Sequence, residues 1–159
     1  MNNLPLAVAI AALIHDDKIL LIKRAKGSYI GFWGLPGGKI EKDEHVSEAA
    51  IREIKEETGI RCLFTQHLGF VSEHLTEKNE VIQHFLLHLC RLQPLTSQFV
   101  EGREGALAWF ALNELPSHRE EIIPSDYAMI EKMLLSQGKN YYNCVVEKKG
   151  DEHHIVRFD

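Results

Sequence analysis

The chain has 159 residues, of which 45% are hydrophobic and 26% charged, and its 18 basic and 23 acidic residues give a formal net charge of −5 at pH 7. This length suits one folded domain with a substantial buried core, and we expect residues 1–159 to form a single domain. The negative charge argues against an extended nucleic-acid partner, whose binding face would be basic. It also means that an anionic phosphate ligand would be repelled unless bound cations inverted the local field.

The distribution of charges and cysteines indicates a cytoplasmic protein without a membrane partner. Lys18 and Lys23 interrupt the most apolar stretch, which is too short for a membrane span of about 20 residues. The N-terminus lacks the ordered basic, apolar and cleavable parts of a signal peptide. Cys62, Cys90 and Cys144 are scattered and odd in number, a pattern typical of buried thiols in a reducing compartment.

The first half of the chain alternates strand and helix patterns. Residues 4–15 and 18–24 are apolar segments around an acidic turn, which predicts a hairpin of buried strands. Residues 26–34 form a glycine-rich loop that carries aromatic side chains. Residues 44–58 contain neither Gly nor Pro and place apolar residues at helical spacing, so we predict an amphipathic helix there.

The second half continues with strands before a late helix. Residues 61–74 and 81–92 are predicted strands joined by a polar turn, and residues 106–112 form a shorter one. Helical spacing of Met, Ile and Leu predicts a last helix, begun by a serine cap at residue 125 and ending near residue 136. Strands on both sides of a central helix indicate a mixed α/β (α+β) fold, an α/β/α sandwich around a central mixed sheet.

A predicted β-hairpin follows the core, which we place at about residues 4–136. Residues 141–147 and 152–158 are strand-like, and Lys149-Gly150-Asp151 supplies the turn. This extension, at about residues 140–159, would complete the sheet, cover the substrate or pair with a second subunit to make a homodimer.

Three glutamates in the central helix carry the strongest functional signal. Glu53, Glu56 and Glu57 fall at i, i+3 and i+4 and therefore share one helix face. Their charges repel one another unless a cation lies between them, and oxygen ligands of this kind suit Mg²⁺ or Mn²⁺. Glycines at 37–38 and at 59 allow a tight entry turn and a left-handed helix end. The alternative is a solvated acidic face with incidental Glu–Arg pairs.

The surrounding residues fit a longer pattern, G-x5-E-x7-R-E-U-x-E-E-x-G-U, in which U is a bulky aliphatic residue. Its fixed positions are filled by Gly38, Glu44, Arg52, Glu53, Ile54, Glu56, Glu57, Gly59 and Ile60. With its lead-in at residues 33–38, this segment resembles the Nudix box of the Nudix (MutT-like) pyrophosphohydrolases. The resemblance is densest over residues 33–60 and argues against the solvated-face alternative.

The resemblance implies the same α/β/α architecture and a divalent-metal site. By this likeness Glu53, Glu56 and Glu57 bind the metal, with the Gly38 carbonyl as a further ligand and Glu44 as an additional candidate. Arg52, which precedes the cluster, would hold the carboxylates in place. The metals, Mg²⁺ or alternatively Mn²⁺, would polarise a phosphoryl oxygen and lower the pKa of the attacking water.

The base that takes the proton from that water has two sets of candidates. Members of the family use either a box glutamate, here Glu56 or Glu57, or a distal glutamate before the last core strand. Glu101 and Glu104 are the distal candidates, and Glu104, five residues before Trp109, is preferred. An ordinary solvated loop acid is the alternative, because a base must lie within hydrogen-bond reach of the water.

A few side chains are candidates for binding the substrate. Arg24 and Lys39 would pair with phosphate, although a surface cation explains each equally well. Phe32 and Trp33 would stack on a nucleobase unless they belong to the core. In relatives that cleave purine triphosphates, acids after a Pro at the start of the last helix read the base. Asp126 matches that position, although a serine precedes it in place of a second acid and helix capping is its simpler role.

Together these features predict a metal-dependent hydrolase of a nucleoside diphosphate linked to another moiety, most simply a (d)NTP cleaved to NMP and pyrophosphate. ADP-ribose or a dinucleoside polyphosphate is the alternative substrate. A non-catalytic nucleotide-sensing module is the alternative from another class. Such modules often lose box glutamates, and this chain keeps them all.

Overall fold

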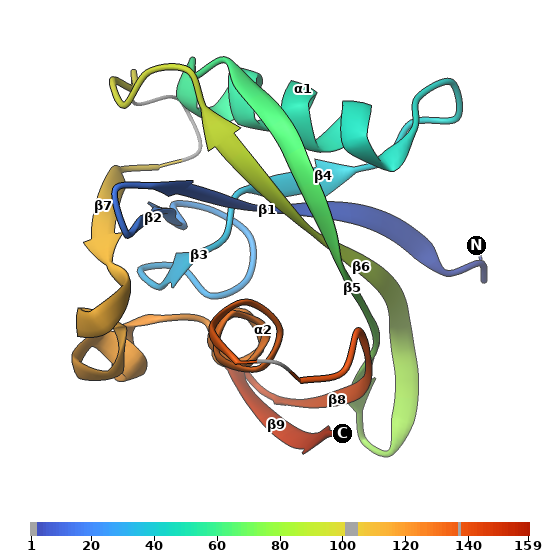
Figure 1. Ribbon diagram of the computed structural model, residues 1–159. Coiled ribbons are helices and arrows are strands. Elements are labelled where there is room, and N and C mark those ends of the chain that lie inside the picture. The colour runs from blue at the N-terminus through green and yellow to red at the C-terminus, as the bar shows by residue number, and fades with distance from the viewer. Residues whose placement is uncertain (1–2, 101–104, 137) are drawn as a thin grey trace.

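A computed structural model describes residues 3–100, 105–136 and 138–159, and it shows one curled sheet with α1 on one face and α2 on the other (Figure 1). The strands are β1 (Leu6–His15), β2 (Lys18–Lys23), β3 (Trp33–Gly34), β4 (Gly37–Lys39), β5 (Cys62–Glu77), β6 (Glu80–Pro94), β7 (Leu107–Ala111), β8 (Tyr141–Lys149) and β9 (Glu152–Phe158). The helices are α1 (Val46–Thr58), the 3₁₀ helix η1 (Leu112–Glu121), α2 (Pro124–Met129) and the π-helical segment η2 (Ile130–Leu135).

The sheet is mixed, as the sequence predicted. Its strands stand in the order β3-β2-β1-β6-β5-β8-β9, while β4 pairs with β1 and β7 pairs with β2. β1 runs parallel to β6, and β5 runs parallel to β8. The remaining pairs are antiparallel.

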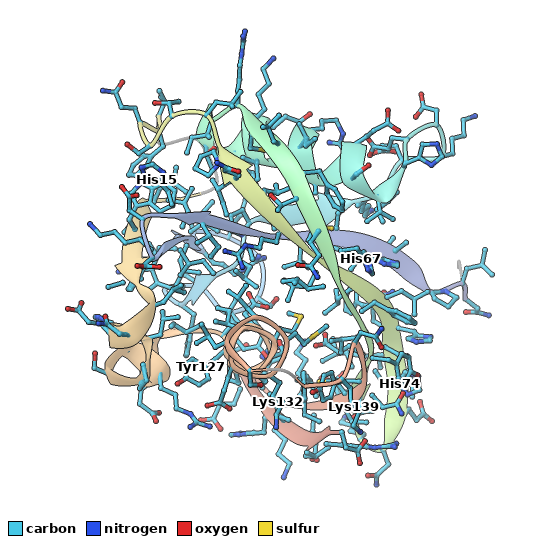
Figure 2. All side chains as sticks on the ribbon, in the orientation of Figure 1. His15, His67, His74, Tyr127, Lys132 and Lys139 are labelled. Carbon is cyan, nitrogen blue, oxygen red and sulfur yellow. The ribbon has the colours of Figure 1, made fainter. Side chains whose placement is uncertain are left out.

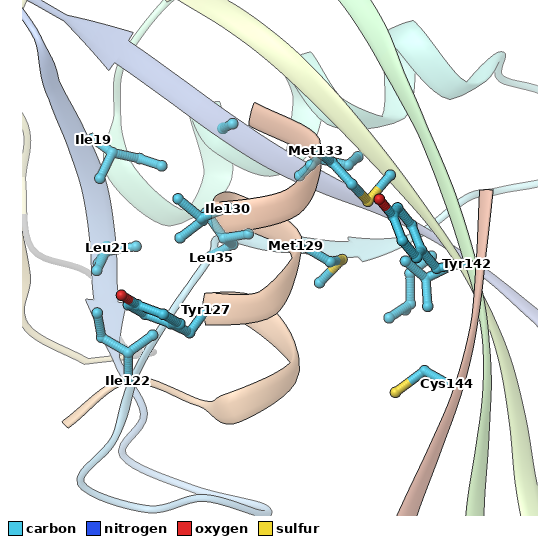
Figure 3. Packing of buried hydrophobic residues seen from close by; sticks show 14 of the residues in the cluster. Ile19, Leu21, Leu35, Ile122, Tyr127, Met129, Ile130, Met133, Tyr142 and Cys144 are labelled. Atoms are coloured by element: carbon cyan, nitrogen blue, oxygen red, sulfur yellow. The ribbon is translucent and has the colours of Figure 1, made fainter. Parts of the chain in front are cut away.

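Alternation of side chains along the central strands produces two separate cores. Ala9 and Ala11 of β1 belong to the apolar cluster under α1, whereas Ala12 belongs to the cluster under α2. Figure 3 shows the second cluster, which contains Ile19 of β2 and Ile130 at the start of η2. Because each face of the sheet is covered by a helix, the predicted α/β/α sandwich is confirmed.

Two hairpin connections are made by consecutive residues in the left-handed region. Asp16 and Asp17 join β1 to β2 with φ of 49° and 58°, and Lys78 and Asn79 join β5 to β6 with φ of 52° and 66°. Two residues with positive φ match the twist of the flanking strands. The predicted turn between the second pair was too long, because β5 and β6 continue to the two-residue turn and reach 16 and 15 residues.

The helices begin at slightly different residues than predicted. α1 starts at Val46, and the N–H of its N-cap residue His45 donates to Glu48 Oε1 at 2.8 Å. The late helix starts at Pro124, which needs no N–H partner at the first helical position. Ser125 is therefore inside the first turn and is not the cap. In the described parts of the chain, no helix is long and apolar enough to cross a membrane.

The predicted terminal hairpin is present as β8 and β9, joined through Gly150 and Asp151. β8 pairs with the second half of β5, from Phe70 opposite Tyr141 onward. Of the three roles considered for this hairpin, completion of the sheet is therefore one that it performs.

Gly69 of β5 lies against Asn140, the residue that precedes β8. It lies at an irregularity in the β5–β6 pairing and has φ of 136°. A Cβ there would collide with the Asn140 carbonyl, which accepts a hydrogen bond from the Phe70 N–H at 2.9 Å. We expect Gly69→Ala to lower the free energy of unfolding by about 2 kcal/mol or more in urea denaturation.

The matched control is Gly150→Ala, at a position that also has a positive φ, 62°, but has no neighbouring atom within 4 Å of the added Cβ. We expect a loss of about 1 kcal/mol from backbone strain alone. Equal losses in the two variants would contradict a role for crowding at Asn140.

Candidate active site

β4 brings two glycines very close to β1 and to α1. Gly37 and Gly38 pair with Ile10 and Ala9 of β1, and a Cβ on Gly37 would collide with the Ala9 carbonyl oxygen. A Cβ on Gly38 would collide with the carboxylate of Glu53. Glycine is therefore required at 37 by the close main chain of β1, whereas a side chain at 38 would displace the carboxylate of Glu53 from its present position.

α1 has an apolar face toward the sheet and carries its acids at the edges of that face. Ala50 and Ile54 are fully buried in the cluster beneath the helix. The side chains of Glu53 and Glu56 are 15% and 57% exposed, and Glu57 is only 6% exposed. The acids that share one helix face thus extend from the solvent into the protein.

The Arg52 guanidinium donates hydrogen bonds from all three of its nitrogens. Nε and Nη2 bind the two oxygens of Glu44 at 2.9 and 2.7 Å. Nη1 binds Glu53 at 3.0 Å and Glu56 at 3.2 Å, and Nη2 also binds the Lys39 carbonyl oxygen at 3.0 Å. The hydrogen bonds from Arg52 lower the pKa of Glu44 to about 2 and raise the pKa of Arg52 itself. This bidentate hydrogen bonding keeps Glu44 ionised beside the helix.

Glu57 borders a small pocket between α1 and the loop that follows β2. Its Oε2 accepts a hydrogen bond from the Gly37 N–H at 3.0 Å. The pocket has a volume of about 80 Å³, and Arg24 and Lys26 also line it. One acidic and two basic side chains therefore border the same space, an arrangement suited to phosphate oxygens near a bound cation.

The oxygen ligands at α1 fit a hard divalent cation. The carboxylate of Glu53 lies directly against Gly38, whose carbonyl is the further candidate ligand, and such all-oxygen sets are the ones that Mg²⁺ and Mn²⁺ prefer. In the structure Glu53 and Glu56 are paired with Arg52, and across the described residues no three His, Cys, Asp or Glu side chains converge as a metal site. An ion at α1 would therefore compete with Arg52 for these carboxylates.

Two histidines of β5 each contact a histidine of the neighbouring strand β6. Nε2 of His67 lies 3.0 Å from Nδ1 of His88, and the rings of His74 and His84 are 4.5 Å apart. Figure 2 shows His67 and His74 along the long hairpin of β5 and β6. These contacts join two side chains each, which is fewer than a metal site needs.

The other candidate residues lie in different surroundings. Nε of Arg24 donates to the Ser28 carbonyl at 2.7 Å, so this side chain folds the loop after β2 as well as lining the pocket. Lys39 is exposed on β4 beside the acidic face. The distal base candidates Glu101 and Glu104 lie outside the described residues. Trp33 packs edge-on against a phenylalanine of β7 at 5.0 Å, which is a core contact.

Asp126 is buried, and it interacts with a partly buried acid, Glu73, that was not among the residues predicted from the sequence. Its Oδ2 accepts a hydrogen bond from the Leu35 N–H at 2.9 Å, and burial raises the pKa of Asp126 to about 6. The Cys144 thiol donates to Glu73 of β5 at 3.8 Å. Burial and then the charge of Asp126 raise the pKa of Glu73 to about 7. Burial and both carboxylates raise the pKa of the Tyr29 phenol, which places this side chain beside them.

Comparison with known proteins places this geometry in a family. The sequence profile of the NUDIX domain matches residues 5–133. The chain is 37% identical over 125 residues to the ADP-ribose pyrophosphatase of Methanocaldococcus jannaschii, covering 76% of this chain and 72% of that protein. It is 31% identical over 127 residues to the CTP pyrophosphohydrolase of Escherichia coli, covering 79% and 89%.

A solved structure supports the fold independently. The crystal structure of a mutator MutT protein from Bacillus halodurans is similar with a TM-score of 0.75 and 21% identity, covering 97% of this chain and 96% of that one. The chain therefore belongs to the Nudix family and is a Nudix pyrophosphohydrolase. Members of this family generally use divalent metal ions and act on small nucleotide substrates.

The buried acids should give stability an unusual dependence on pH. The folded-state pKa of Glu73 is about 7, above its ordinary value of 4.5, so the folded protein binds this proton more tightly than the unfolded chain does. The stability that this group contributes is fully present below pH 4.5 and is lost as the pH rises through 7. We expect Glu73→Gln to remove on the order of 1–3 kcal/mol of that decline in the free energy of unfolding.

The measurement is urea denaturation at several pH values across this range. Glu80→Gln serves as the control, because Glu80 is exposed at the start of β6. The control should keep the wild-type pH dependence. The same dependence in Glu73→Gln would show that the folded protein does not hold a proton on this carboxyl.

Proposed function

We propose that this protein hydrolyses a nucleoside diphosphate linked to another moiety, most simply a (d)NTP to NMP and pyrophosphate, with Mg²⁺ as cofactor and Mn²⁺ as the alternative. One observation carries the proposal: the acidic face of α1 meets a pocket with two basic side chains at Glu57. Opposite charges at one place suit a substrate that is itself anionic and binds together with a cation.

The roles of the residues follow from their positions. Glu53, Glu56 and Glu57, with the Gly38 carbonyl, are the proposed ligands. Bound ions would polarise a phosphoryl oxygen and lower the pKa of a bound water. Arg52 positions Glu53 and Glu56 through its hydrogen bonds, and a main-chain N–H of β4 positions Glu57.

The reaction needs a base for the attacking water. The water oxygen attacks one phosphorus, the bond from that phosphorus to the bridging oxygen breaks, and the leaving phosphate keeps the electron pair. The base accepts the proton released by the water. We retain Glu56 or Glu57 as box candidates and Glu104, or alternatively Glu101, as the distal one.

Four side chains are proposed to bind the substrate. Arg24 and Lys39 would neutralise phosphate oxygens, and Arg24 already lines the pocket beside the acidic face. Asp126 would accept a hydrogen bond from the base. Trp33 would contribute its partly exposed ring, although its packing against β7 gives it a core role as well.

ADP-ribose is a second candidate substrate because the 37% identical relative is named an ADP-ribose pyrophosphatase. A dinucleoside polyphosphate has no comparable support among the relatives described above. The complete set of box glutamates, together with the Arg52 contacts that hold them, favours an enzyme over a non-catalytic sensing module.

Removing one proposed ligand should abolish most of the activity without unfolding the protein. We expect Glu57→Gln and Glu56→Gln each to lower kcat at least about 100-fold, because an ion that stabilises developing charge is lost or displaced. Glu131→Gln, at an exposed position on η2, is the control and should keep wild-type kcat. A chelator should stop the reaction and added Mg²⁺ should restore it. Near-wild-type turnover in either ligand variant would refute the assignment.

The substrate proposal is tested by product analysis with a panel of nucleotides. With Mg²⁺, (d)NTPs should give NMP and pyrophosphate, and they should have a higher kcat/KM than ADP-ribose or dinucleoside polyphosphates. A higher kcat/KM for ADP-ribose, with AMP and ribose 5-phosphate as products, would favour the second candidate. No hydrolysis of any phosphoanhydride in the panel would reject the proposed function.

A further inference from the structure

The C-terminal hairpin borders a wide groove, which we call the hairpin groove. Its volume is about 830 Å³, within the usual range for ligand sites. It is lined by residues 27–30 and Phe32 of the loop between β2 and β3, by Leu75 of β5 and Pro124 of α2, and by Lys148 and residues 151–154 of the hairpin. The hairpin wall lies outside the segment, 5–133, that the family profile matches.

Consecutive residues of the loop after β2 line the pocket beside Glu57 and then the hairpin groove. Arg24 and Lys26 line that pocket, and Gly27 is the first residue of the groove wall. Arg24 holds this loop in a tight fold through its hydrogen bond to the Ser28 carbonyl at 2.7 Å. A ligand with phosphates at Glu57 could therefore follow the loop and place its next group in the groove.

The two walls of the groove are chemically different and suit the two halves of a nucleoside. On the loop side, the rings of Tyr29 and Phe32 are 5.8 Å apart, and Ile30 is 64% exposed. On the hairpin side, Lys148 and Glu152 supply a donor and an acceptor. Lys148 also lies 4.0 Å from Glu77, and Glu152 lies 3.2 Å from His154, both in solvent-accessible pairs that a ribose hydroxyl would join. The aromatic and apolar wall suits the flat face of a base, and the polar wall suits ribose hydroxyls.

At the aromatic end of the groove, the loop after β2 and the hairpin contact each other. The imidazole of His153 on β9 lies 4.5 Å from the ring of Tyr29, at an interplanar angle of 36°. The pair forms a composite aromatic surface from residues that lie far apart in the sequence. Burial, and then the charges of Glu73 and Asp126, raise the pKa of the Tyr29 phenol, which therefore keeps its proton.

We propose that the hairpin groove is the nucleoside subsite of this protein, in which the base packs on the Tyr29–His153 pair and Lys148 binds the ribose. Trp33 does not line the groove, so this placement of the base is an alternative to a contact with Trp33. This inference rests on the proposed function, which places the phosphates of the substrate beside Glu57. It gives the C-terminal hairpin a second role, because a strand that completes the sheet also forms one wall of the site.

The test separates binding of the nucleoside from binding of the phosphates. AMP, GMP, CMP and UMP are titrated without metal by calorimetry, and inorganic pyrophosphate is used with Mg²⁺ as a competitive inhibitor that has no base. We expect His153→Ala to weaken binding of the monophosphates roughly 5- to 20-fold, since a stacking surface is lost. It should raise KM for the best substrate by a similar factor, and it should leave kcat and pyrophosphate inhibition within about twofold.

Two variants sharpen this experiment. His153→Phe keeps a ring at the same place and should restore binding. Arg157→Ala changes an exposed side chain elsewhere on β9, outside the groove, and should bind like the wild type. In the unaltered protein, the ring NMR signals of His153, identified by sequential resonance assignment of the wild type, should shift when AMP is added. This measurement needs no variant, so it remains decisive if a variant fails to fold.

The outcomes distinguish this inference from the proposed function. Monophosphate binding within twofold of wild type in His153→Ala, or an equal loss of pyrophosphate binding, overturns the nucleoside subsite even if hydrolysis is normal. Binding of monophosphates that depends on His153 supports the subsite even if the panel shows no hydrolysis, in which case only the proposed function fails. An AMP titration that leaves the His153 signals unchanged overturns the subsite.

Discussion

The Arg52 guanidinium joins parts of the chain that would otherwise repel one another. Its three nitrogens bind Glu44, Glu53 and Glu56, together with the Lys39 carbonyl at the end of β4. Without this cation, carboxylates from the loop before α1 and from α1 itself would repel one another more strongly. Because the same hydrogen bonds connect β4 to the helix, the shape of the acidic face depends on a single side chain. Any ion that binds the glutamates must act against these contacts, so Arg52 affects both the geometry and the affinity of the site.

Small side chains lie between α1 and the sheet. Ala9 and Ala11 of β1 and Ala49 and Ala50 of α1 are all fully buried in one cluster. These alanines add little bulk between the helix and the sheet, and larger side chains such as Ile54 and Leu20 fill the rest of the cluster. The helix thereby lies near enough to β4 for Glu57 to accept a hydrogen bond from the main chain at 3.0 Å. Packing that looks purely structural therefore positions a proposed metal ligand.

Local patterns in the sequence were sufficient for the longer strands, for α1 and the late helix, and for the acidic face of α1. They did not predict the short strands β3, which lies in a predicted loop, and β4. Hydrophobic periodicity and fixed spacing depend only on neighbouring residues, so they can be read without knowing the fold. The raised pKa of Glu73 could not be predicted in this way, because the residues that interact with it, Asp126 and Cys144, come from distant elements. One local signal was available, an acid between the inward-facing Val71 and Leu75. The stacking of Tyr29 on a histidine of β9 has no local signal at all.

The parallel pairing of β8 with β5 also has a consequence for how the protein is made. β5 is 16 residues long, and the edge of its second half pairs with β8. The partner residues are synthesised 71 residues later, as the registers of Phe70 with Tyr141 and Thr76 with Glu147 show. Until β8 emerges from the ribosome, that edge presents unpaired amide and carbonyl groups to other chains. Exposed strand edges of this length are sites of aggregation. A protein shortened before β8 would therefore be prone to aggregation even though its acidic helix and most of its core were complete.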